Sequence, residues 1–449
     1  MVLHAPRHRL RRHQARLGLI LVTVLVIPFE MLNGQDRSHP VADSAAAARR
    51  FYQEATAAFR SGNIKKASEL ADSAQRSWPA QTAYLAAWAS LAARLGDTVT
   101  AARALERVAS LGGTHPVERD PAFQAIVEAP AIARARQLLA ANLTDLVRST
   151  PAATVGDGDL FAESLALGPE GTLFVGSVRQ RTVVRRTPAG VETDLTSGGD
   201  SLWAVLGLGL TADGGSLWLA SSAVSQMVGY DSTLEGRSEL VRVSLATGRV
   251  TRRVPIPSGE RGATLGDILV ARDGTVYASD TRGPTIWVLP PGASEPRLLA
   301  RHPLIRSPQG LVLSRDGTRL LVTDYSHGVL SIHLADGRVD RLPFPADVTV
   351  LGIDGLARHG GDLIGIQNGG VAPRVLRLRL DPSEQRILAV EVIDRHLSVA
   401  DEPTVGVVLG DHFFYVASSQ WGKRHDDGTP RSGAALIPTV ILRLPLARE

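Results

Sequence analysis

The sequence has no cysteine, and only three of its 49 basic residues are lysine. The missing cysteine excludes disulfide bonds, thiolate metal sites, a cysteine nucleophile and a lipidated N-terminal cysteine. Aromatic residues make up only 5% of the chain, and after residue 34 no apolar run is long enough to span a bilayer. What remains is ordinary globular composition, 44% hydrophobic and 21% charged, in 449 residues that allow two or three domains.

A surplus of positive charge is also missing from the main part of the chain. The net charge of +4 arises in residues 1–34, which hold five arginines and one glutamate; the rest holds 44 basic and 44 acidic side chains. A protein that binds nucleic acid through its phosphates needs a basic surplus in its folded part. We therefore expect no nucleic-acid partner.

The N-terminus has the pattern of a secretory signal. A basic stretch, MVLHAPRHRLRRHQAR, is followed by LGLILVTVLVIPF, thirteen apolar residues that end at Phe29. This order predicts a signal peptide over residues 1–34. An uncleaved membrane anchor is the alternative, and only this alternative gives the protein a membrane partner. Either interpretation predicts an exported protein, periplasmic or secreted.

Residues 41–142 are rich in Ala, Leu, Glu and Arg, with apolar residues three and four apart, and this pattern predicts helices. Gly62 and Gly96 are 34 residues apart, as are Ala67 and Ala101. A helix–turn–helix period of this length resembles tetratricopeptide repeats. Such repeats form either a groove that recruits a protein partner or a helical cap on the next domain, and so few of them favour the cap.

From residue 143 the period changes to that of strands. Six short turns separate apolar strands at intervals of 43 to 60 residues: 170–171, 213–214, 273–274, 316–317, 360–361 and 410–411. Six copies of a four-stranded unit predict an all-β six-bladed propeller over residues 143–449. The sixth copy ends one strand short. We expect LTDLVRST (143–150) to supply its outer strand and close the ring.

The propeller segments ESLALGPEGTLFVGS, GDILVARDGTVYASD and IDGLARHGGDLIGIQNGG resemble the family of senescence marker protein, gluconolactonase and luciferin-regenerating enzyme. The resemblance covers nearly all of 159–449. It implies a propeller with a divalent cation on its axis and hydrolysis of lactones. The family's cation ligands, a Glu, an Asn and an Asp that open blades one, four and five, correspond to Glu163, Gln309 and Asp354.

This sequence departs from the family pattern at two places. Gln309 is one methylene longer than the family's Asn, and the Asn-Asp pair that contacts substrate in blade three is Gly266-Asp267. Oxygen ligands of this kind suit Ca²⁺ first, with Mg²⁺, Mn²⁺ and Zn²⁺ as alternatives. The resemblance implies that Asp354 or Asp267 is the base that activates water.

The geometry of a propeller also predicts, independently of the family resemblance, that these residues lie together. Inner strands start, and second strands end, on one face of a propeller, so Glu163, Asp267, Gln309 and Asp354 should share a rim with Asn368 and Gln420. A small-molecule substrate is therefore expected to contact Asp267, Asn368, Gln420 and Trp421. Asp280 and Asp324 also end second strands, and for these two the sequence favours capping of loop amides.

Two insertions lie at the same rim, the blade-two loop (222–239) and the blade-six loop (419–438). They either cover the pocket or are surface excursions, and Trp421 is either a stacking wall for a ring-shaped ligand or a hydrophobic plug. The sequence thus predicts an exported, metal-dependent hydrolase of a lactone or related ester. The alternative is a non-catalytic propeller that binds a small ligand or, through its helices, a protein.

Overall fold

The structure is a computed structural model that describes residues 39–196, 202–257 and 259–447. The predicted signal or anchor, residues 1–34, lies outside these described residues. Residues 38–449 form one compact unit. No helix among the described residues is both long and apolar enough to cross a membrane.

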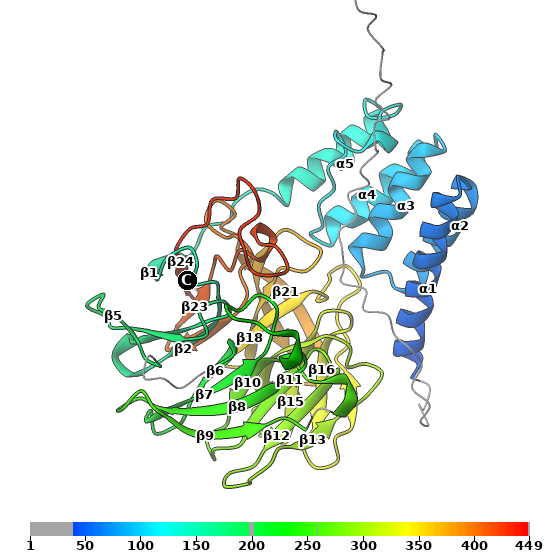
Figure 1. The fold of residues 1–449 in the computed structure, drawn as a ribbon. Helices are drawn as coiled ribbons and strands as arrows, with labels where there is room; N and C mark the ends of the chain where they lie inside the picture. Colours follow the sequence, from blue (N-terminus) through cyan, green and yellow to red (C-terminus); the bar gives the residue numbers. More distant parts are fainter. Residues whose placement is uncertain (1–38, 197–201, 258, 448–449) are drawn as a thin grey trace, which may run out of the picture. The chain divides into compact units, whose positions relative to one another are not determined.

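The N-terminal part of this unit is helical, as predicted (Figure 1). Its helices are α1 (Pro40–Arg60), α2 (Ile64–Ser77), α3 (Thr82–Arg94), α4 (Thr98–Ser110) and α5 (Pro130–Ala141). The 34-residue spacing falls on equivalent helix starts. Gly62 and Gly96 both take positive φ between helices. Helix α2 starts two residues after Gly62, and α4 starts two residues after Gly96. Asn63 and Asp97 cap these helices, each accepting a backbone N–H from three residues on. Membership of the tetratricopeptide class stays a prediction.

The remainder is the predicted six-bladed propeller, six antiparallel sheets of four strands each. Blades one to three comprise β2 (Ala162–Leu167), β3 (Leu173–Ser177), β4 (Val183–Arg186) and β5 (Glu192–Asp194); β6 (Ala204–Leu210), β7 (Ser216–Ser222), β8 (Ser238–Ser244) and β9 (Val250–Pro255); and β10 (Leu265–Val270), β11 (Val276–Asp280), β12 (Thr285–Leu289) and β13 (Arg297–Ala300). Blades four and five comprise β14 (Pro308–Leu313), β15 (Arg319–Asp324), β16 (Gly328–His333) and β17 (Val339–Arg341); and β18 (Ile353–His359), β19 (Asp362–Gln367), β20 (Arg374–Leu380) and β21 (Ile387–Asp394).

The sixth blade joins the two ends of the propeller. It contains β22 (Gly406–Leu409), β23 (His412–Val416), β24 (Thr439–Pro445) and, as its outer strand, β1 (Thr150–Val155). The inner strands contact one another in sequence, and β22 contacts β2. Apolar side chains from neighbouring sheets fill the space between blades, as between Trp218 in blade two and Ile268 in blade three.

The closing strand exists, but its predicted position at 143–150 is wrong. The strand that pairs with β24 is 150–155, and Leu146 instead bridges to Arg395 at the end of blade five. The prediction rested on the position of 143–150, between the helices and the first blade. An outermost strand tolerates proline, here Pro151, because its free edge needs no N–H donor, and the register shifts at this residue.

Candidate functional site

Four of the predicted residues lie where inner strands begin, at irregularities in the sheet register. In blades one, three, four and five the pairing of the inner strand slips after its first residue, at Glu163, Gly266-Asp267, Gln309 and Asp354. A bulge leaves a residue out of the ladder and redirects its side chain. These polar side chains therefore do not follow the alternation that buries neighbouring side chains between the blades.

Glu163 is held by two residues of the blade-six loop. Its Oε2 accepts hydrogen bonds from Ser419 Oγ at 2.6 Å and from the indole Nε1 of Trp421 at 2.8 Å. Burial, and next the negative charge of Asp354, raises the pKa of Glu163 well above its ordinary value. The two carboxyl groups, from blades one and five, are therefore close enough to repel each other when both are ionised.

Asp354 belongs to a network of side chains between blades four and five. Its Oδ2 contacts the hydroxyl of Tyr325 at 2.9 Å and accepts from Asn368 Nδ2 at 2.8 Å. Asn368 Nδ2 also donates to the carbonyl of Pro403 at 2.9 Å, so its Oδ1 faces Tyr325 at 2.6 Å. Burial raises the pKa of Asp354 to about 6, and the bonds from Asn368 and Tyr325 limit that rise.

Asp267 and Gln309 have fewer partners. Asp267 Oδ1 accepts from the N–H of Ile268 at 2.8 Å, and burial, with a smaller contribution from the charge of Asp354, raises the pKa of Asp267 to about 7. Gln309 Nε2 donates to Ser307 Oγ at 3.3 Å. Neither Asp267 Oδ2 nor Gln309 Oε1 accepts a hydrogen bond from any residue that the structure describes.

The candidate ligands Glu163, Gln309 and Asp354 all offer oxygen atoms, the donors that hard cations prefer. Hydrogen bonds hold one oxygen of Glu163 and one of Asp354, and within the described residues the other oxygen of each accepts none. Outer partners that fix one carboxylate oxygen and leave the second free are typical of ligands to Ca²⁺ and similar ions. The described residues contain no group of three or more His, Asp or Glu side chains placed to hold a metal. The candidate set of two carboxylates and the Gln309 amide is compatible with that finding.

Two predicted substrate contacts have their polar atoms engaged within the protein. The amide of Gln420 donates to the carbonyl of Ile437 at 2.9 Å and accepts its N–H at 3.0 Å, and the side chain is buried. Asn368 uses both ends of its amide, as described above. Trp421 packs edge-on against Phe161, with ring centroids 4.6 Å apart. Their roles toward a substrate stay predictions.

Backbone strain gathers around Glu163. Of the six non-glycine residues with positive φ in the described chain, Phe161, Glu402 and Gln420 flank Glu163 or its partners. Phe161 lies two residues before Glu163, and Gln420 lies between Ser419 and Trp421. Glu402 accepts the N–H of Gly422 and its charge acts on Glu163. Such conformations cost about 1–3 kcal/mol each and cluster at functional sites.

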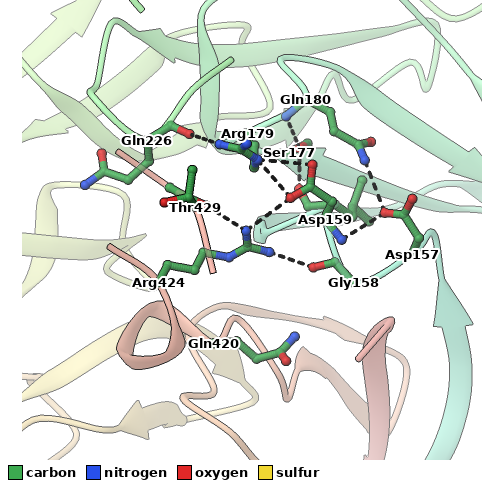
Figure 2. Close-up of polar contacts among 12 residues, drawn as sticks. Asp157, Gly158, Asp159, Ser177, Arg179, Gln180, Gln226, Gln420, Arg424 and Thr429 are labelled. Carbon is green, nitrogen blue, oxygen red and sulfur yellow. Dashed lines mark hydrogen bonds and ion pairs between the residues drawn. The ribbon is translucent and has the colours of Figure 1, made fainter. Parts of the chain in front are cut away.

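The blade-two and blade-six loops meet at the rim of blade one (Figure 2). Arg179 pairs with Asp159 at 2.8 Å and donates to the carbonyl of Gln226 in the blade-two loop. Arg424 of the blade-six loop is buried; it contacts Asp159 at 3.2 Å and donates to the carbonyl of Gly158 at 2.6 Å. The insertions are therefore joined through two arginines on one aspartate rather than being separate surface excursions.

A cavity of about 290 Å³ opens beside these loops. It is lined by Ala223, Val224, Ser225, Gln226, Tyr230, Glu235, Thr264 and Arg282. Val224 and Tyr230 pack in the same apolar cluster as Trp421 and Phe161. This cluster links the wall of the cavity to the indole that holds Glu163.

Asp280 and Asp324, which end second strands, cap loop amides, as the sequence favoured. Asp280 accepts backbone N–H groups of Thr264, Arg282 and Gly283. Asp324 accepts those of Arg306, Ser307, Ser326 and His327. Both carboxylates cap loops and are not among the groups whose charge acts on Glu163 or Asp354.

Sequence reasoning missed Tyr325, Ser419 and Glu402. Tyr325 directly follows the end of a second strand and contacts the next blade, a place where the sequence search considered only the preceding Asp324. Glu402 lies in the irregular segment before β22 and Ser419 in the one after β23, where no repeat positions them. Tyr325 alone carried a signal, because it occupies the position just beyond a second strand.

No protein-family model and no curated protein matches the chain. Among solved structures, a luciferin-regenerating enzyme is 13% identical and has a TM-score of 0.48, covering 66% of this chain and 94% of its own. A gluconolactonase from Xanthomonas campestris is 16% identical with a TM-score of 0.45 over 69% and 93%. The calcium-binding protein regucalcin from Agrobacterium tumefaciens is 16% identical with a TM-score of 0.44 over 65% and 93%. Likenesses of this size leave the function to be argued from the chain's own site.

Proposed function

We propose that the protein is a divalent-cation-dependent hydrolase of a lactone or related ester, with the cation held by Glu163, Gln309 and Asp354. One observation carries the proposal. Burial, and next the charge of Asp354 in blade five, raises the pKa of Glu163 in blade one, and each of the two carboxyl groups keeps one oxygen unbonded among the described residues. A cation between such groups offsets the cost of ionising both.

A bound cation would polarise the carbonyl of the ester and stabilise the negative charge that develops on its oxygen. The chain's own residues supply the base. Asp267 has a pKa raised to about 7 and an unbonded Oδ2, so near neutral pH it can take a proton from water. Asp354 is less suited to this role because Tyr325 and Asn368 occupy its Oδ2 and the proposal assigns its other oxygen to the cation.

Calorimetric titration with Ca²⁺, Mg²⁺, Mn²⁺ and Zn²⁺ tests the cation site. Glu163→Gln and Asp354→Asn each remove one charge with little change of shape, and each should weaken binding at least about 100-fold. Asp213→Asn is the control, because Asp213 caps an exposed turn of blade two. If the wild type and Asp354→Asn bind all four ions equally weakly, the proposed site does not exist.

Proton release from a panel of γ- and δ-lactones tests the chemistry separately. Asp267→Asn should lose hydrolysis by about 100-fold or more while its Ca²⁺ affinity changes little. A variant that lost both together would point to Asp267 as a ligand instead of a base.

A non-catalytic ligand-binding propeller is the second candidate. The cavity beside the two loops favours it, because it lies outside the carboxylate pair and its volume is near the lower limit for small-molecule pockets. A purified protein with no stoichiometric cation and no lactone turnover would support this candidate over the enzyme.

We also propose that the protein is exported, on the strength of the basic and apolar order of residues 1–34. N-terminal sequencing of material from outside the cytoplasm should return a chain that begins near residue 35. A chain that begins at Met1 would support the uncleaved anchor.

A further inference from the structure

The turn between β19 and β20, residues 368–373, lies between the candidate site and the helices. Its first residue, Asn368, bonds Asp354 Oδ2 at 2.8 Å. Two residues later the carbonyl of Gly370 accepts a hydrogen bond from the hydroxyl of Thr82, the first residue of α3, at 2.7 Å. A single short turn therefore contacts both a proposed cation ligand and the helical region.

Tyr325 supports this turn from the propeller side. A Cβ atom placed on Gly369 would lie 2.7 Å from the ring of Tyr325, so only glycine allows this approach. The carbonyl of Tyr325 accepts the N–H of Gly352, whose own carbonyl accepts the N–H of Gly369 at 3.0 Å. The position of Tyr325, and with it the contact to Asp354, thus depends on the turn.

The helices fix the turn from the opposite side. Besides the bond from Thr82, Arg374 at the end of the turn donates to the carbonyl of Leu111, which follows α4, at 3.0 Å, and to Gln367 Oε1 at 2.7 Å. Thr82, Arg374 and Gln367 are all buried. Buried and fully bonded polar groups hold their partners in one arrangement, because a lost bond leaves an unsatisfied group.

We infer that the helical region positions the cation site: Thr82, acting through Gly370, and Tyr325, acting on Asp354 and Asn368, are positioning residues. The cation part of this inference rests on the proposed function. In this arrangement the helices are a working part of the propeller's site, and whatever displaces α3 also loosens Asp354.

The test compares Thr82→Val, which keeps the shape and removes the hydroxyl, with Thr82→Ser, which keeps the donor. Arg107→Gln is the matched control, because Arg107 also joins the helices to the propeller but bonds the carbonyl of Ala346, outside the turn. Hydrogen exchange of residues 368–373 and the dissociation constant for Ca²⁺ are measured on each full-length variant.

We expect Thr82→Val to speed exchange in the turn and weaken Ca²⁺ binding about fivefold, the effect of one buried hydrogen bond. Thr82→Ser should restore both, and Arg107→Gln should change neither. Tyr325→Phe should weaken Ca²⁺ binding by a similar factor while leaving exchange in the turn unchanged, because the ring stays.

A purely structural contact gives a different result. If Thr82→Val lowers the melting temperature but leaves both exchange in the turn and Ca²⁺ affinity at wild-type values, the inference is wrong. If the wild type binds no cation, the proposed function fails, and the exchange pattern of Thr82→Val, Thr82→Ser and Arg107→Gln still decides whether the helices fix the turn beside Asp354.

Discussion

The two carboxylates of the candidate site occupy equivalent places in their blades, yet the protein holds them by different means. Glu163 depends on a loop: its hydrogen-bond partners are Ser419 and Trp421, and positive-φ residues flank the whole arrangement. Asp354 depends on side chains from regular blades, Tyr325 and Asn368, and on the helices behind them. Positive-φ residues therefore gather mainly on the Glu163 side, while Asp354 is held by side chains that directly follow strands of blades four and five.

This difference indicates which half of the site moves. A loop that holds strained residues opens at lower cost than a bonded network between two sheets. We expect the Glu163 side to adjust when a cation or substrate binds and the Asp354 side to stay fixed. The predictions below separate the two sides, beginning with the largest expected effect.

Removal of the closing strand should damage the Glu163 side most, because β1 completes the blade that carries Ser419 and Trp421. A chain that starts at residue 158 lacks both β1 and the helices, whereas one that starts at 143 lacks only the helices. We expect the shorter chain to be less stable by roughly 3–5 kcal/mol, about 10 °C in melting temperature. Calorimetry on the pair measures this, and equal melting temperatures would contradict the closure.

Loss of Arg424 should release the blade-six loop. Arg424→Met removes the bonds to Asp159 and Gly158 but keeps an apolar group against Phe161, over which the guanidinium lies at 4.4 Å. We expect a loss of about 2–3 kcal/mol in unfolding free energy and weaker Ca²⁺ binding. Arg358→Met, which breaks the pair with Glu384 in blade five, is a control that should cost stability without affecting Ca²⁺.

The stability of the cation-free protein should depend on pH. Folding raises the pKa of Asp267 to about 7 and that of Asp354 to about 6, so the folded state binds more protons than the unfolded state between about pH 4 and 7. These groups therefore lower stability as pH rises through that window. Ca²⁺ should reverse the loss at pH 8. Melting at pH 5 and pH 8, with and without Ca²⁺, measures this; a double Asp267→Asn, Asp354→Asn variant should show less of it.

The smallest expected effect is that of the indole N–H. Trp421→Phe keeps a ring against Phe161 but removes the bond to Glu163, which still accepts from Ser419. We expect Ca²⁺ affinity to fall about fivefold, with the melting temperature nearly unchanged. Unchanged affinity would show that Ser419 alone orients Glu163.

The repeated turns made the blades predictable, because hairpin signals recur at intervals of 43 to 60 residues with a short apolar strand on each side. The repeats do not indicate the contacts that form the site. The bulges at Glu163 and Asp354 depend on pairing between strands, which no local pattern records. The contact of Tyr325 with Asp354 crosses from one blade to the next.

The misplaced closing strand teaches a related lesson. The position of 143–150 along the chain favoured that segment, but pairing depends on which segment reaches the free edge of β24, and that segment is 150–155. The capping roles of Asp280 and Asp324 were easier to anticipate, since each carboxylate bonds N–H groups of its own blade or of the loop beside it.

The closing strand also constrains the order in which this chain can fold. The register pairs Thr150 with Arg443, so the sixth blade contains residues from the start and the end of the propeller. During synthesis the sixth blade stays incomplete until β24 emerges and pairs with β1, and contacts so distant in sequence form slowly. For the export proposed above, this delay would keep the ring from closing, and from blocking a translocation pore, before the C-terminus has been made.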